Sequence, residues 1–234
     1  MSHYTVTIVL PEAPVPRAAN EGQAHVEEMI GTLLAPFDEN EEVEAYKEHV
    51  RPLPEHWRHA TQRELGWPYV MIRDEAPEVD LEDPAAVAAF MNARYGEDGG
   101  EPEYHVDEQG LYQMSTYNPN SKWDWWALGG RWTGIYKLRP GAITGIVGRT
   151  GVFGDPAPAG HVDVARKGDI DTENCNVVTY AVLAEGVWRA PGDMGWFGMS
   201  SEEEAEQQDY EKWFQEFWDG LGDDVWLAVV DLHI

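Results

Sequence analysis

Two histidines and one aspartate near the two ends of the chain are the first candidates for chemistry. Asp231 and His233 lie two residues apart in an apolar run that is typical of a strand, so their side chains share one face. If a strand at the start of the chain pairs antiparallel with this run, His3 lies close to His233. Two imidazoles and a carboxylate could bind a divalent metal, or act as a general acid/base site. Alternatively, these side chains only satisfy one another's hydrogen bonds at the open end of a sheet.

A Trp-rich block at residues 117–132 is the second candidate. It has four tryptophans within residues 123–132, and its only charged residues are Lys122, Asp124 and Arg131. Stacking and bidentate hydrogen bonds could hold an anionic or planar ligand such as a nucleotide. The candidate ligand-binding residues are Lys122, Trp123, Asp124, Trp125, Trp126, Arg131 and Trp132. The alternative is an aromatic core in which Asp124 pairs with Arg131 or Lys122.

The elements that must position the first cluster lie at the two ends of the chain. Residues 4–10 alternate in polarity and are rich in Thr, Val and Ile, which predicts a strand. Residues 225–234 form a nearly continuous apolar run, as expected for a central strand covered on both faces. Residues 21–35 carry an amphipathic helical stripe. A last helix is predicted to begin at Ser201, the N-cap of a capping box with Glu204.

Sequence patterns in the middle of the chain predict shorter helices and strands. Residues 41–66 are interpreted as one or two helices broken at prolines, and residues 69–73 as a short strand. Asp83 and Pro84 open a further helix, which Gly96 closes.

Two segments of the middle part are expected to lie outside the core. Residues 74–110 are acidic and poor in large apolar runs, which indicates an inserted or peripheral segment. The glycine-rich residues 141–160 indicate a long surface loop.

Together these elements predict a single α+β domain spanning residues 1–234. Strand, helix and broken helices come first; a hairpin around Gly186, a helix and a strand follow. This order favours a mainly antiparallel sheet with helices packed on it, and a decorated ferredoxin-like fold is one topology of this kind. In that topology the first and last strands are antiparallel neighbours near the middle of the sheet, which would bring His3 and His233 together.

The composition excludes several classes of protein. Lys and Arg number 16 against 43 Asp and Glu, so the formal net charge is −27. That excess argues against direct nucleic-acid binding and against docking on an anionic membrane. No run of residues is long and apolar enough for a membrane span, the first residues lack the features of a signal peptide, and Cys175 is the only cysteine. We therefore expect a cytoplasmic protein without disulfides.

One short motif at the start of the chain points to a known chemistry. His3-Tyr4-Thr5-Val6 resembles the His-apolar-Thr-apolar pattern of two-histidine phosphodiesterases, in which one His acts as base and the other as acid. Those enzymes need two such motifs. The second copy is missing here, because neither His161 nor His233 is followed two residues later by a hydroxyl side chain.

Several motifs in fixed order resemble an uncharacterised family of tailed-bacteriophage and prophage proteins. The motifs are the opening residues 1–6, residues 34–40, the block ending at 129–132, residues 194–198 and the ending 230–234. The resemblance implies a phage origin and an accessory role inside the host cell. It assigns no activity to any residue.

Two functions follow as hypotheses. The first is an acidic accessory protein that binds and blocks or sequesters a host component, either a host protein or a small nucleotide, in host takeover or in defence against host immunity. The second is a metal- or His-dependent enzyme that acts on a nucleotide or phosphodiester, with His3, Asp231 and His233 as its site and a divalent metal as a candidate cofactor.

Overall fold

A computed structural model shows that the chain divides into two compact units. Unit 1 comprises Met1–Glu41 and Asn118–Ile234, and unit 2 comprises Glu42–Tyr117. The structure describes residues 2–14, 19–62, 64–96, 103–143, 145–150, 155–194 and 203–234.

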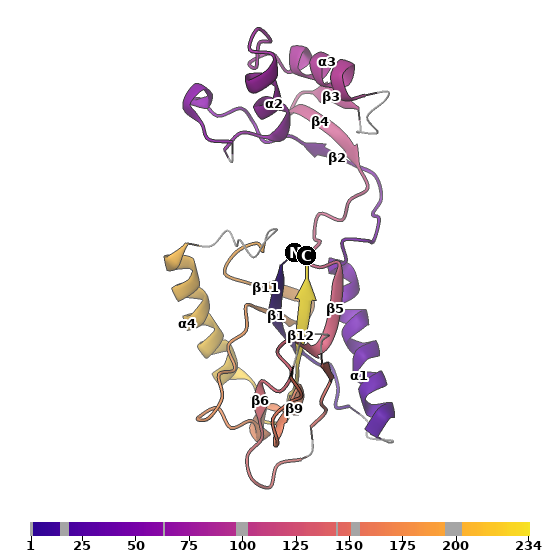
Figure 1. Ribbon diagram of the computed structural model, residues 1–234, viewed down its shortest axis with the longest axis vertical. Coiled ribbons are helices and arrows are strands. Elements are labelled where there is room, and N and C mark those ends of the chain that lie inside the picture. Colours follow the sequence, from indigo (N-terminus) through magenta and orange to yellow (C-terminus); the bar gives the residue numbers. More distant parts are fainter. Residues whose placement is uncertain are drawn as a thin grey trace. The chain divides into compact units, whose positions relative to one another are not determined.

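Unit 1 is built on a mixed β-sheet. Its strands lie in the order β11-β10-β1-β12-β5-β7, and β9 also pairs with β12 (Figure 1). The strands are β1 (His3–Val9), β5 (Trp125–Gly130), β7 (Arg149–Thr150), β9 (Val164–Arg166), β10 (Ala181–Ala184), β11 (Val187–Arg189) and β12 (Trp226–His233).

The first and last strands are antiparallel neighbours in the middle of this sheet, as predicted. The register of β1 and β12 runs from His3 opposite His233 to Val9 opposite Leu227. On the outer sides, β5 pairs antiparallel with β12, whereas β10 pairs parallel with β1. The α+β class is confirmed, with 29% helix and 27% strand. The ferredoxin-like topology stays a prediction, and the parallel β1–β10 pair is a feature that an all-antiparallel sheet lacks.

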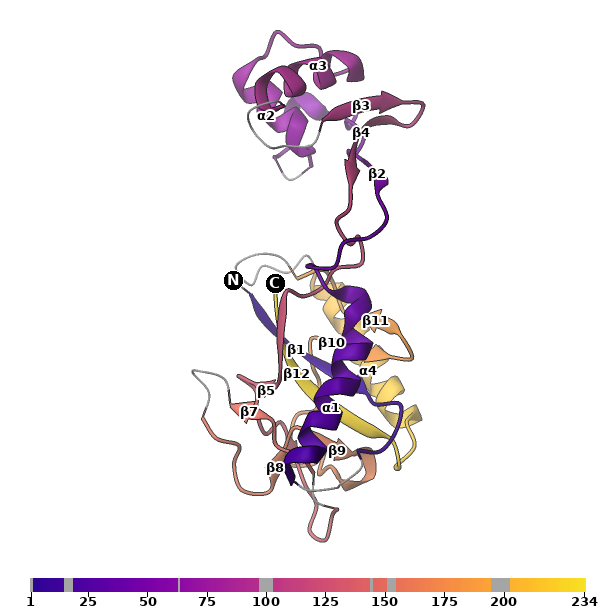
Figure 2. The same cartoon turned by 90° about the vertical axis from the view of Figure 1, so that its right-hand side faces the viewer.

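Two long helices cover the opposite faces of the sheet in unit 1 (Figures 1 and 2). Helix α1 (Ala19–Leu34) packs Val26, Ile30 and Leu34 against one face, on Tyr4, Val6 and Ile8 of β1 and their neighbours. Helix α4 (Glu204–Gly220) packs its aromatic stripe of Tyr210, Phe214 and Trp218 against the other face. Strand β12 is buried on both faces because its alternate residues contribute to these two cores.

The remaining elements of unit 1 are short. They are η1 (Ala35–Phe37), β6 (Tyr136–Lys137), β8 (His161–Val162) and η3 (Lys167–Asp169). Strand β7 lies within the predicted glycine-rich loop of residues 141–160, of which residues 144 and 151–154 are outside the described part. The hairpin predicted around Gly186 is present as β10 and β11.

Helix α4 begins with a capping box, but later in the chain than predicted. Glu203 is the N-cap, and its side chain and that of Glu206 satisfy each other's backbone N–H groups. The cap predicted at Ser201 lies outside the described residues.

Unit 2 has its own small sheet and its own core. The sheet has the order β2-β4-β3, and helices α2 and α3 pack together with it around buried residues that include Tyr69, Ile72, Met91 and Leu111. Its elements are β2 (Tyr46–His49), η2 (Trp57–His59), α2 (Trp67–Glu75), α3 (Pro84–Tyr95), β3 (Tyr104–Asp107) and β4 (Gly110–Ser115).

Two local predictions in unit 2 are wrong. The described residues of 41–66, all but residue 63, contain strand β2 and the 3-10 turn η2 instead of the one or two helices predicted, because the prolines at 52 and 54 leave too short a run. Residues 69–73 belong to helix α2 rather than to a strand: Pro68 occupies the first helical turn, and Tyr69 and Ile72 are buried together at helical spacing. The helix opened by Asp83 and Pro84 and closed at Gly96 is confirmed as α3, with the Asp83 carboxylate accepting from the Ala85 N–H.

The acidic segment of residues 74–110 lies entirely within unit 2. It supplies α3 and β3 to that unit and contributes Val87, Met91 and Tyr104 to its core. The single domain predicted for residues 1–234 stays a prediction, since a cooperative folding unit can include more than one compact unit. No helix in the described ranges is long and apolar enough to cross a membrane.

Replacing residues 43–116 with a short Gly-Ser linker should leave unit 1 folded. Its sheet takes no strand from unit 2, and the two chain segments at the junction are held together inside unit 1. Asn118 donates to the carbonyls of Pro36 and Asp38 at 3.0 Å each, and the Glu39 N–H donates to the Trp123 carbonyl at 2.8 Å. The measurement is near-UV circular dichroism with urea unfolding beside the full chain. Loss of a cooperative transition would instead favour one domain spanning both units.

Candidate functional site

The first cluster lies on the α4 side of the sheet, at the end of β1 and β12 where the two chain termini meet (Figure 1). Tyr4 and Leu232 belong to the core under α1. Because strand side chains alternate, His3, Asp231 and His233 point to the opposite face. The strand pairing alone therefore brings residues 228 positions apart into contact.

His3 is held by a buried carboxylate. Its Nδ1 lies 2.8 Å from the Oδ1 of Asp231, a residue that is only 1% exposed. The other carboxylate oxygen of Asp231 accepts a hydrogen bond from the backbone N–H of Arg131 at 3.0 Å. Asp231 thus has one oxygen on the imidazole and one on the backbone, which fixes the orientation of the His3 ring.

His233 is held in the same way by a different carboxylate. Its Nδ1 lies 2.5 Å from Oδ1 of Asp124, whose side chain is 37% exposed. The rings of His3 and His233 meet edge to face with their centroids 4.9 Å apart. Neither Nε2 has a hydrogen-bond partner within the described residues. Each of the two oriented imidazoles therefore offers an Nε2 atom for proton transfer.

Trp125 adds an exposed aromatic surface beside the histidines. It is 48% exposed, lies opposite His233 in the β5–β12 register, and its ring centroid is 6.0 Å from that of His3. A large exposed indole next to two imidazoles could stack on a planar group.

Two buried carboxylates lie so close to the end of β5 that residues 129 and 130 must be glycine. Both glycines have positive φ, 70° and 55°. A Cβ on Gly130 would lie 2.4 Å from the Asp231 Cβ, and one on Gly129 would lie 2.4 Å from an oxygen of Asp163. Only glycine lets this backbone turn against both side chains.

The Asp163 carboxylate holds the backbone that follows this turn. It is fully buried and accepts from the Gly134 and Gly148 N–H groups and from the Thr133 hydroxyl, at 2.5, 2.7 and 2.8 Å. Burial raises the pKa of this carboxyl, although the three donors oppose the rise. Asp163 therefore ties the loop at residues 133–134 to the segment at Gly148.

The predicted metal ligands are brought together, but not as a metal cage. His3, Asp231 and His233 meet as the strand pairing predicted, with the imidazoles bound to carboxylates at Nδ1. Among the residues that the structure describes, no group of three or more His, Cys, Asp or Glu side chains is arranged to hold a metal ion. The metal-binding role stays a prediction without support from this geometry.

The predicted Trp-rich block divides between core and site because of strand alternation. Trp123 is 8% exposed, and its indole N–H donates to the Leu34 carbonyl at 3.0 Å. Trp126 packs against the same core, beneath α1, and Trp132 is partly buried. Only Asp124 and Trp125 carry side chains into the histidine cluster.

The charged residues of the block do not pair with one another as the core alternative predicted. Asp124 pairs with His233, and Lys122 pairs with Asp193 at 2.9 Å. Arg131 is exposed and serves the cluster through its backbone N–H. Sequence reasoning missed the Asp124–His233 pair and the role of Asp163; the adjacent glycines at 129 and 130 were the only signal of a close backbone approach.

No family model, curated protein or solved structure matches this chain. The resemblance to a phage protein family therefore stays a prediction. What the cluster can do chemically follows from its geometry alone.

Gly130→Ala should disrupt the Asp231 anchor and destabilise unit 1 by roughly 2–5 kcal/mol, because it combines a strained backbone with an overpacked core. The matched control is Gly186→Ala. Gly186 has a similar positive φ of 76°, but nothing lies within 4 Å of its added Cβ, so only about 1–2 kcal/mol is expected. Urea denaturation of both variants measures the difference. An equal loss of unfolding free energy in the two variants would show that Asp231 moves aside without an energetic cost.

Proposed function

We propose that unit 1 carries a histidine acid/base site that acts on a phosphodiester bond of a small nucleotide. The observation that supports the proposal is the pair of imidazoles, 4.9 Å apart, each bonded through Nδ1 to its own carboxylate. Of the two functions considered from the sequence, this geometry favours the His-dependent enzyme.

The proposed reaction needs one neutral and one protonated imidazole. A carboxylate at Nδ1 keeps the proton of a neutral imidazole on that atom and its lone pair at Nε2. One Nε2 would take the proton from an attacking water or sugar hydroxyl as the new P–O bond forms. The other would donate a proton to the leaving oxygen as the old P–O bond breaks. The reaction exchanges one P–O bond for another and involves no redox step.

The surroundings favour a small nucleotide over a polymer. The exposed Trp125 ring offers a stacking surface for one base. The net charge of −27 opposes the approach of a polyanion such as RNA or DNA, whose binding needs many Lys and Arg contacts. A single phosphodiester carries one negative charge and meets much less repulsion.

Substituting either histidine should abolish most of the activity. In assays with cyclic mononucleotides, cyclic dinucleotides and bis(p-nitrophenyl) phosphate, His3→Ala and His233→Ala should each lower kcat/KM by about 10²–10⁴-fold. The double variant should be little worse than the poorer single variant, since the two groups act together. The pH profile of the wild type should be bell-shaped and should lose one limb in each single variant.

The control is His56→Ala, because the side chain of His56 is 61% exposed and belongs to unit 2. Activity should persist after treatment with EDTA. Activity that is lost in EDTA and restored by a divalent cation would favour the metal-dependent version of the site. Absence of turnover with all three substrate types, or full activity in the folded His3→Ala and His233→Ala variants, would contradict the proposal.

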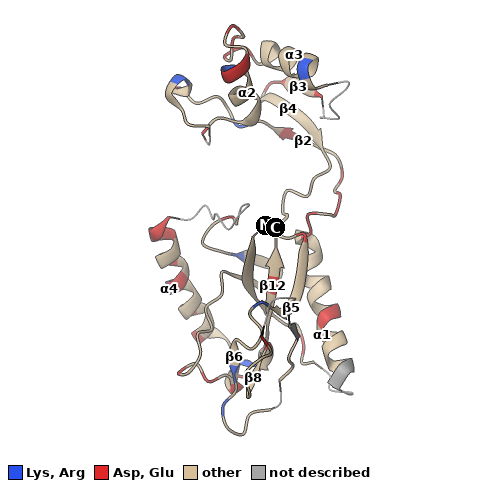
Figure 3. Cartoon of the chain, viewed as in Figure 1, with Lys and Arg blue, Asp and Glu red and all other residues tan. Residues whose placement is uncertain are grey.

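The acidic surface favours a second candidate function, that of a protein that binds and blocks a host component. Figure 3 shows Asp and Glu along α1 and α4 with few basic residues among them. On α4 the exposed residues include Glu204, Glu211 and Glu216, and Lys212 is the only basic residue of the helix. Such a surface would steer a basic partner electrostatically.

This second candidate predicts a salt-sensitive complex. Tagged protein incubated with host lysate should retain a stoichiometric basic partner at low ionic strength and release it at high ionic strength, where screening shortens the range of the attraction. Mass spectrometry of the bound fraction identifies the partner. Retention that does not change with salt would contradict electrostatic blockade.

A further inference from the structure

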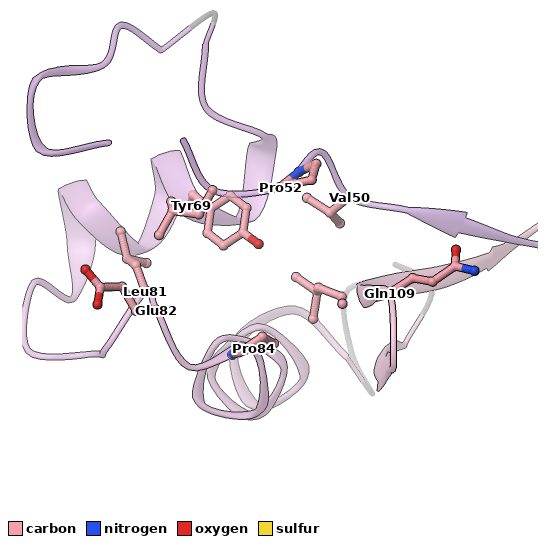
Figure 4. A pocket seen from close by; sticks show the side chains of 10 residues that line it. Val50, Pro52, Tyr69, Leu81, Glu82, Pro84 and Gln109 are labelled. Atoms are coloured by element: carbon pink, nitrogen blue, oxygen red, sulfur yellow. The ribbon is translucent and has the colours of Figure 1, made fainter. Parts of the chain in front are cut away.

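Unit 2 contains a cavity of about 300 Å³ between its sheet and its two helices (Figure 4). Its walls are mostly aliphatic and proline side chains, among them Val50, Leu53, Leu81 and Leu111. An apolar cavity of about 150 Å³ is large enough to bind benzene. The cavity in unit 2 therefore has room for a two-ring group and lies at the small end of the range for ligand pockets.

The hydroxyl of a largely buried tyrosine points into this cavity. Tyr69 is only 5% exposed and lines the cavity, and Figure 4 shows its hydroxyl directed into the open space. It forms no hydrogen bond with any residue that the structure describes. The hydroxyl faces the open space of the cavity, where it can exchange a hydrogen bond with a molecule that enters.

The polar side chains at the rim of the cavity favour a positively charged ligand over a negatively charged one. Glu82 is exposed at the mouth, and one of its carboxylate oxygens accepts from the Trp57 indole N–H at 3.2 Å, which leaves the other oxygen available. Gln109 is the other polar side chain of the lining, and no Lys or Arg is part of it. A carboxylate or phosphate ligand would meet uncompensated repulsion here, whereas an ammonium group would pair with Glu82.

We propose that this cavity binds a small aromatic amine. Its ring system would fill the apolar space, a ring N–H or acceptor would bond to the Tyr69 hydroxyl, and its ammonium group would lie at the Glu82 carboxylate. This site is separate from the histidine cluster and does not depend on the function proposed for it.

The test uses the full chain and three probes that differ only in charge and tail. Isothermal titration calorimetry with tryptamine should give saturable binding, indole should bind more weakly, and indole-3-propionate should not bind. Tyr69→Phe, which removes only the hydroxyl, should weaken tryptamine binding about 5-fold. Glu82→Gln should weaken it about 10-fold and should leave indole binding unchanged.

Two matched variants separate the cavity from general effects of substitution. Tyr95→Phe removes a hydroxyl that pairs with Glu75 on the surface, and Glu78→Gln removes an exposed charge outside the cavity lining. Both should bind tryptamine as the wild type does. Equal binding of tryptamine and indole-3-propionate, unchanged binding in both Tyr69→Phe and Glu82→Gln, or no binding of tryptamine at millimolar concentration would overturn the proposal.

Discussion

The antiparallel pairing of β1 with β12 is the interaction on which unit 1 depends. It joins the first and last segments of the chain through seven residue pairs in the centre of the sheet. Strand β10 adds to the free edge of β1 and β5 to the free edge of β12, so the rest of the sheet is built outward from this pair. Helix α1 then packs on a face whose residues come largely from these two strands, and β12 adds Leu227 and Val229 to the core under α4.

The same pairing makes the candidate site, because its register places His3 directly opposite His233. A slip of one residue would turn every side chain of one strand to the other face and would separate the two imidazoles. The apolar residues on the α1 side, such as Val6, Ile8 and Val230, oppose such a slip, since each would leave the core. Core packing on one face therefore fixes the geometry of the polar cluster on the other.

Buried carboxylates connect the site to the surrounding backbone. Asp231 holds His3 and the Arg131 N–H, and Asp163 holds three loop donors. Removing such carboxylates from water is costly, and the hydrogen bonds that they accept offset this cost. Positive φ at Gly129 and Gly130 lets the backbone approach both side chains. The turn, the two carboxylates and the His3 orientation thus form one coupled structure.

Unit 2 is organised independently of this arrangement. It encloses a core of its own between α2, α3 and a three-stranded sheet, and its cavity, which the Tyr69 hydroxyl faces, opens beside that core. The histidine cluster and the cavity therefore use different residues, different elements and different chemistry. One offers proton transfer at the end of a sheet, and the other offers an open apolar pocket with a carboxylate at its mouth.

Strong local patterns in the sequence determined much of the fold. Period-two alternation and apolar runs located β1 and β12, a helical stripe located α1, and the Asp83-Pro84 signal located α3. Short segments were less predictable: residues 69–73 are compatible with strand or helix by pattern, and burial of Tyr69 and Ile72 on one helical face decided the outcome. The His3–His233 proximity followed from the expected strand order, because antiparallel neighbours bring opposite chain ends together.

Only the tertiary structure decided which side chains share the site. The Trp-rich block is uniform as a sequence, yet the pleat of β5 sends Trp126 into the core and Trp125 to the histidines. The partner of Asp124 is His233 rather than Lys122 or Arg131, since β12 lies beside β5 and brings that imidazole within hydrogen-bond distance. Local pattern determines the type of an element and its buried face, whereas contacts between distant segments depend on sheet order and register, which local pattern does not encode.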